Sequence, residues 1–227
     1  MLFEIRLRHD RDPATEAYQD FVAWVDENSV LGARGAAAEI NYAFLPVTRL
    51  QSYFDRRQLS KLLEVLFKDD VPPDHRILRE KYSKVFCILL YIGKREYIEH
   101  FMQHESLNDQ RLPFDPQRPT HFPRDPNDQE FFSNFYKTQC MLCVPKFHYN
   151  IAEKFEKDRI LPITEKCRID ARGSAKIYRI KIHEAYDGLV PLGNEQKVRA
   201  MVLPFSQQNC FELIKHRISA ITLTHTF

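Results

Sequence analysis

The spacing of apolar residues changes once along this chain, and that change limits the possible folds more than any other feature. Up to about Pro145 apolar residues recur every three or four positions, as in LSKLLEVLF from Leu59 to Phe67, which is the spacing of a helix with one buried stripe. After Asp158 they alternate with polar residues, as in YRIKI from Tyr178 to Ile182, which is the spacing of a half-buried strand. The pattern predicts an α+β protein.

We expect two regions on either side of this change. A helical region should occupy residues 1–150, and a small antiparallel β-sheet with one helix should occupy residues 159–227. A chain of 227 residues with 44% apolar content can fill the core of one large domain or two small ones.

Local capping signals predict where the helices of the first region begin and end. Asp12, Asp55, Asp74 and Asp125 each precede a helical run and can accept hydrogen bonds from its first backbone N–H groups. The run from Asp74 should continue as one helix to Gly93, followed by a short helix over residues 94–103. Residues 112–126 hold five of the 13 prolines, which excludes regular structure and predicts an extended ordered loop or a linker.

The second region should contain three main strands. They are expected from Ile160 to Ile169, from Tyr178 to Ile182 and from Val198 to Leu203. A helix should then start near Ser206, and the last residues, AITLTHTF, favour another strand. These elements would give the second region its own small sheet.

Charge and cysteine content bear on partners and location. The chain has 33 basic and 31 acidic residues, so its net charge of +2 creates no strong field, and we expect neither nucleic acid nor a membrane as a partner. The longest apolar run, CILLYI from Cys87 to Ile92, is much shorter than the roughly 20 residues that span a bilayer. Five cysteines without a secretory leader predict reduced thiols and an intracellular, cytoplasmic or nuclear, location.

Two short patterns raise the question of a metal. Cys140 and Cys143 have the spacing of half a zinc site, and His100 and His104 lie four residues apart. Neither pair has further ligands at the expected spacing. Packing of the cysteines and a solvated pair of histidines are therefore the favoured interpretations.

One run in the second region, IDARGSAKIYRI from Ile169 to Ile180, resembles the glycine-rich loop of protein kinases. Its setting is a strand, a small-residue turn, a strand, a third strand with a central alanine and a helix, which is the order of the kinase small lobe. VFCILLYIGKREYIEHF, RLPFDP and HYNIAEKFEKDRILPI resemble the helical region that precedes this lobe in fungal protein-kinase-like proteins. The resemblance extends from about Phe44 to Phe205.

The resemblance implies a serine/threonine kinase-like lobe that binds ATP with magnesium. The residues that match its degenerate nucleotide site are Ile169, Asp170, Arg172, Gly173, Ser174, Ala175, Ile177, Ala200 and Val202. Glycine is needed in such a loop because backbone N–H groups approach the phosphates closely. Here the three glycine positions hold Asp170, Arg172 and Ala175.

The run VRAMV departs from the family further. It places Val202 where the family has its phosphate-anchoring lysine, so Glu212, the candidate for the helix glutamate that pairs with this lysine, has no partner. Neither His-Arg-Asp nor Asp-Phe-Gly occurs in the sequence. The sequence therefore predicts a truncated kinase-like protein, a pseudokinase without catalytic residues, in which the loop is either a surviving nucleotide site or the remnant of one.

A second hypothesis treats the chain as a non-enzymatic helical protein-interaction module. Under both hypotheses we expect a protein partner, because a small lobe without its large lobe exposes apolar surface.

Overall fold

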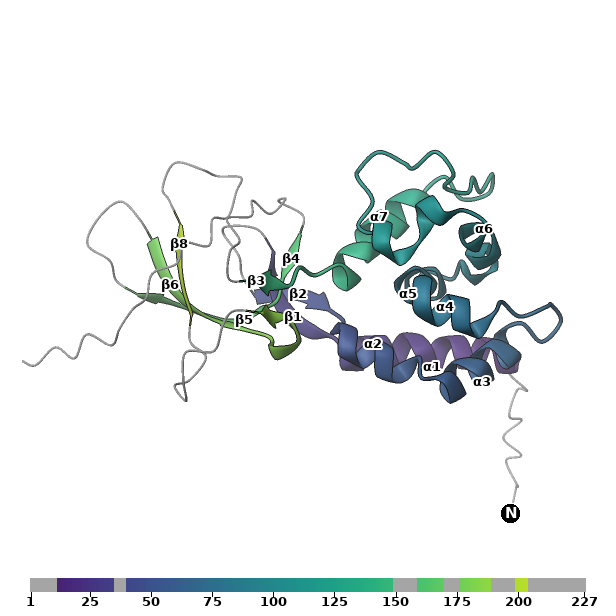
Figure 1. Ribbon diagram of the computed structural model, residues 1–227, viewed down its shortest axis with the longest axis horizontal. Coiled ribbons are helices and arrows are strands. Elements are labelled where there is room, and N and C mark those ends of the chain that lie inside the picture. Colours follow the sequence, from purple (N-terminus) through teal and green to yellow (C-terminus); the bar gives the residue numbers. More distant parts are fainter. Residues whose placement is uncertain (1–11, 35–39, 149–158, 170–175, 189–198, 204–227) are drawn as a thin grey trace, which may run out of the picture. The chain divides into compact units, whose positions relative to one another are not determined.

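The computed structural model describes residues 12–34, 40–148, 159–169, 176–188 and 199–203 (Figure 1). Over these residues the protein has an α+β fold. It divides into two compact units, the first made of Met1–Asn28 with Val47–Gln139 and the second of Ser29–Pro46 with Cys140–Phe227. This division differs from the expected one near residue 150, because Ser29–Pro46, within the expected helical region, belongs to the second unit.

The first unit is helical. Its elements are α1 (Pro13–Asn28), α2 (Val47–Tyr53), α3 (Arg56–Leu66), α4 (His75–Lys81), α5 (Ser83–Tyr91), η1 (Arg95–Tyr97), α6 (Ile98–Met102), η2 (Glu105–Leu107), η3 (Asp109–Arg111) and most of α7 (Phe131–Leu142). Figure 1 shows α1, α2 and α3 as neighbours within this unit.

Three of the four predicted helix starts are confirmed. The carboxylate of Asp12 accepts a hydrogen bond from the Thr15 backbone N–H at 3.2 Å, and Asp55 accepts one from the Gln58 N–H at 2.8 Å. Asp74 accepts one from the N–H of Arg76 at 2.8 Å. These caps are local, since each acceptor lies within three residues of its donor, and a sequence window contains both partners.

The predicted start at Asp125 is wrong. Its carboxylate accepts hydrogen bonds from the Asn127 N–H at 2.9 Å and from the Lys94 Nζ at 2.6 Å, and α7 begins only at Phe131. The side chain therefore closes a turn and an ion pair instead of a helix.

The predicted single helix from Asp74 to Gly93 is two helices, α4 and α5, which meet at Tyr82. The cause is Asp109, whose carboxylate accepts hydrogen bonds from the N–H groups of Lys84 and Val85, both at 2.9 Å. An acid that lies about 25 residues away along the chain thus caps α5. Gly93 follows α5 with a positive φ of 70°, as expected for a helix end.

The proline-rich segment has no helix or strand, as predicted, and it is held in place by α7. Gln139 is 1% exposed. Its Oε1 accepts a hydrogen bond from the Phe114 N–H at 2.8 Å, and its Nε2 donates one to the Phe114 carbonyl at 2.9 Å. Phe122, within the segment, packs against Phe135 of α7, with ring centroids 5.3 Å apart. The segment is therefore an ordered loop.

The second unit is built from short strands. They are β1 (Val30–Arg34), β2 (Ile40–Phe44), β3 (Phe147–His148), β4 (Ile160–Leu161), β5 (Ile163–Ile169), β6 (Lys176–Ile182), β7 (Asp187–Gly188) and β8 (Arg199–Leu203), with η4 (Glu184–Tyr186) after β6. The sheets have the orders β2-β1-β4, β3-β7 and β5-β6-β8, and the β3–β7 pair is parallel while the others are antiparallel.

The hairpin of β1 and β2 corrects the prediction that residues 1–150 are helical. Neither VLGAR in β1 nor INYAF in β2 alternates apolar and polar residues, so a period of two does not reveal these strands, and β1 gains its second neighbour from β4, far along the chain. Gly32 permits this pairing, because a Cβ at that position would lie 2.5 Å from the Leu161 carbonyl oxygen. The helix expected from Ser206 and the strand expected in the last residues lie outside the described residues.

Candidate functional site

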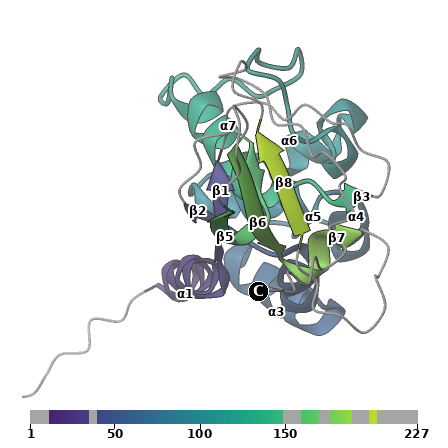
Figure 2. The same cartoon turned by 90° about the vertical axis from the view of Figure 1, so that its left-hand side faces the viewer.

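The candidate site is the sheet of β5, β6 and β8, which contains the strands of the kinase-like resemblance. Figure 2 shows the three strands side by side, with β6 in the centre. Residues 163–169 and 176–182 pair as antiparallel neighbours, and residues 199–203 pair with the other edge of β6. The predicted set of three antiparallel strands in this order is therefore present, but the first expected strand, from Ile160 to Ile169, is divided into β4, which pairs with β1, and β5.

The register brings several of the predicted site residues into adjacent positions. Ile169 is the Cα partner of Ile177 on β6, and Ile177 is in turn the partner of Val202 on β8. The three residues thus form one row across the sheet. Ala200 lies opposite Arg179, two positions along.

The structure does not describe the position of the remaining predicted residues. Asp170, Arg172, Gly173, Ser174, Ala175 and Glu212 lie outside the described residues. For Ile169, Ile177, Ala200 and Val202 the structure describes the backbone only. The structure therefore places β5 and β6, the strands before and after residues 170–175, and the backbone of the row formed by Ile169, Ile177 and Val202.

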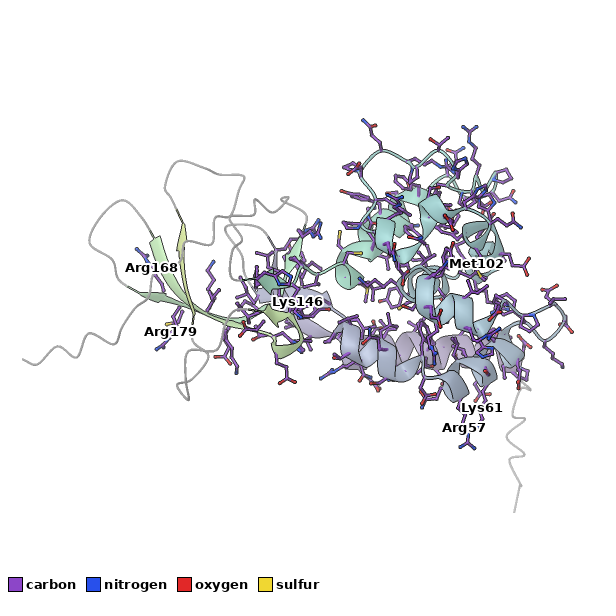
Figure 3. All side chains as sticks on the ribbon, in the orientation of Figure 1. Arg57, Lys61, Met102, Lys146, Arg168 and Arg179 are labelled. Atoms are coloured by element: carbon purple, nitrogen blue, oxygen red, sulfur yellow. The ribbon has the colours of Figure 1, made fainter. Side chains whose placement is uncertain are left out.

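One face of the β5–β6 pair is polar and exposed. Glu165 and Lys181 are direct partners in the register and form an ion pair at 2.7 Å, and both side chains are more than 60% exposed. Arg179, two residues before Lys181, is also exposed. Figure 3 shows Arg168 and Arg179 on opposite sides of the sheet, as expected for their alternating positions in the register.

The other face of β6 is anchored in the core of the second unit. Ile180 and Ile163 are each 1% exposed. After β6 the chain turns, and the His183 and Tyr186 rings both lie 5.7 Å from the ring of the buried Phe44 on β2. These contacts fix the end of β6 that lies away from residues 170–175.

Arg179 is a candidate that sequence reasoning missed. It is an exposed cation opposite Ala200, the residue that the resemblance assigns to the nucleotide. The alternation of polar residues in β6 indicated that Arg179 would be exposed. Only the register between β6 and β8 shows that Ala200 is the residue opposite Arg179.

The cysteines pack as expected, whereas the histidine pair has a third histidine beside it. Cys143 is buried, and Cys140 is half-buried. His100 and His104 have ring centroids 4.9 Å apart, and the ring of His121, from the proline-rich segment, stacks on that of His104 at 4.6 Å. Shielding from solvent and the two neighbouring histidines lower the pKa of His104.

Within the described ranges, no group of three or more histidine, cysteine, aspartate or glutamate side chains is arranged to hold a metal ion.

Comparison of the chain with protein-family models, with curated proteins and with solved structures found no match in any of the three. None of the helices in the described part of the chain combines the length and apolar character needed to cross a membrane.

Proposed function

We propose that this chain is a protein-kinase-like protein whose β5–β6–β8 sheet binds an adenine nucleotide without transferring its phosphate. The observation that carries the proposal is the row of Ile169, Ile177 and Val202 across three antiparallel strands. This row flanks the loop of residues 170–175, as the resemblance requires for residues around an adenine ring. The ligand class is therefore ATP with magnesium, as in kinases.

Binding should be weak because the site has lost its main cation. Val202 occupies the position of the phosphate-anchoring lysine, and Asp170 occupies the first glycine position, where its charge repels phosphate. Arg179 is exposed in the adjacent strand and can partly replace the missing charge. Since the 227 residues contain neither His-Arg-Asp nor Asp-Phe-Gly, we propose no phosphoryl transfer for them.

Restoring the lysine tests the proposal directly. In a Val202→Lys variant the new ammonium should bind phosphate, and a hydrogen bond to a charged group is worth about 1.5–3 kcal/mol, or roughly a 10- to 150-fold gain in affinity. Calorimetric titration of the full chain with ATP and magnesium measures this gain. The matched control is Val202→Met, which adds similar length without charge and should bind as the unchanged chain does.

Two outcomes would contradict the proposal. One is that neither the unchanged chain nor the Val202→Lys variant binds ATP at millimolar concentration while circular dichroism shows both to be folded. The other is an equal gain in ATP affinity for Val202→Lys and Val202→Met, which would show that the added charge does not bind phosphate.

The expected protein partner is also a proposal, and two exposed apolar residues support it. Leu31 on β1 is 53% exposed and Tyr42 on β2 is 37% exposed. They lie on neighbouring strands but on opposite faces of the hairpin, because Tyr42 is the partner of Gly32 in the register and Leu31 is the partner of Ala43. Each face of the hairpin therefore exposes one apolar side chain that a partner would cover.

A further inference from the structure

A shallow groove with a volume of about 630 Å³ crosses the surface of the helical unit between α1, α2 and α3. Trp24 from α1 and Tyr53 from α2 supply aromatic rings, and Arg49 and Lys61 supply two positive charges. Hydroxyl and amide side chains complete the lining, and none of the described residues that line it is acidic. We refer to this site as the α1–α3 groove.

The aromatic part of the α1–α3 groove is fixed by the core behind it. The rings of Trp24 and Tyr53 are in contact, with centroids 4.1 Å apart, and both residues are half-buried. Tyr53 also packs on Phe21 at 5.5 Å and on Phe54 at 5.6 Å, and both phenylalanines are fully buried. A ligand would therefore meet aromatic surface that is already ordered, which reduces the entropic cost of binding.

The two cations line the same groove as this surface. The Nη1 of Arg49 donates a hydrogen bond to the Asn28 carbonyl at the end of α1 at 2.7 Å, so the guanidinium is held in position. Lys61 extends from α3 into solvent together with Arg57, one turn earlier (Figure 3). Both arginine and lysine can bind carboxylates, and arginine can do so with two parallel hydrogen bonds.

Tyr53 adds a neutral donor to the groove. Burial and the nearby carboxylate of Asp20 raise the pKa of its phenol. The hydroxyl group, which like that of any tyrosine carries its proton at neutral pH, can donate a hydrogen bond to a carbonyl or carboxylate oxygen.

We propose that the α1–α3 groove binds an acidic peptide segment of a partner protein. An apolar side chain of the peptide would cover Trp24 and Tyr53, and its carboxylates would lie beside Arg49 and Lys61. Tryptophan, tyrosine and arginine are the residues that contribute most to protein–protein binding. The hydroxyl and amide groups of Thr48, Ser52 and Gln58 can bond to the backbone of an extended peptide.

The charge of the groove favours a peptide over nucleic acid. Protein–nucleic acid affinity depends on many lysine and arginine contacts to phosphates, whereas only two cations line this groove. The proposal does not depend on nucleotide binding by the β5–β6–β8 sheet, because all the residues that carry it belong to the helical unit.

Trp24 itself provides the assay, because it is the only tryptophan in the chain. The full chain is titrated with an unlabelled peptide in which aspartates surround one phenylalanine, and the tryptophan emission is followed. We expect a saturable change in emission that weakens as salt is added. A peptide with lysines in place of the aspartates should give no saturable change.

A pair of charge reversals locates the binding. Lys61→Glu reverses a charge within the groove and should lower the affinity by about tenfold or more, as expected for loss of a close charge pair. Lys68→Glu makes the same change at an exposed position of the helical unit outside the groove lining and should alter the affinity less than about twofold. Circular dichroism confirms that both variants are folded.

Three results would overturn the proposal. They are no change in Trp24 emission with the acidic peptide, equal effects of Lys61→Glu and Lys68→Glu, and tighter binding of a single-stranded oligonucleotide than of the peptide. The last result would identify the groove as a nucleic-acid site. Val202→Lys, which alters only the proposed nucleotide site, should leave peptide binding unchanged, so the two proposals can fail independently.

Discussion

Replacing Gln139 with leucine should destabilise the helical unit strongly. Gln139 is 1% exposed and contributes both an acceptor and a donor to the backbone of Phe114, at 2.8 and 2.9 Å. Leucine has a similar volume but neither polar group. In Gln139→Leu the N–H and C=O of Phe114 therefore stay close to the core without these partners, and Phe114 itself is only 7% exposed.

The expected cost follows from the two lost hydrogen bonds. A buried polar group that loses its partner costs about 1–3 kcal/mol, so two such groups reduce the free energy of unfolding by about 2–5 kcal/mol after the gain from burying leucine. The matched control is Asn134→Leu, the same type of change at an exposed position of α7, which should alter stability by less than about 0.5 kcal/mol.

Urea denaturation provides the measurement, with the fluorescence of Trp24 as a probe of the helical unit and circular dichroism as a second probe. The transition midpoint of Gln139→Leu should fall while the slope of free energy against urea stays the same. A free energy of unfolding within about 0.5 kcal/mol of the unchanged chain would refute the reasoning, because the Phe114 groups would then have other partners or free access to water.

Two further predictions concern groups that connect distant parts of the helical unit. Asp109→Ala should lower the free energy of unfolding by about 2–4 kcal/mol, because the N–H groups of Lys84 and Val85 lose their cap. Hydrogen exchange at these two amides should accelerate, and unchanged exchange would contradict the prediction. The Lys94 ammonium lowers the pKa of Asp125 in the folded protein. Ionised Asp125 therefore stabilises the fold fully above its usual pKa of about 4, and this stabilisation is lost as the pH falls through the lower pKa of the folded state. An acid titration of Asp125→Asn should therefore show a smaller loss of stability below about pH 4, and identical titration curves would rule out this linkage.

The sequence alone determined the features that depend on neighbouring residues. Asp55 and Asp74 cap α3 and α4 within a few positions, and the alternation of apolar and polar residues located β5 and β6. For the candidate site, the sequence supplied the strands and the residues at their ends, because strand periodicity is visible in a short window. These interactions form between residues that a local pattern contains.

Tertiary structure decided the features whose partners lie far along the chain. Asp109 divides the predicted helix at Tyr82, β4 completes the sheet of β1 and β2, and His121 joins His104. The α1–α3 groove likewise forms only when Trp24 meets Tyr53. No local pattern encodes these pairings, because their stability comes from packing and hydrogen bonds that exist only after distant segments have come together.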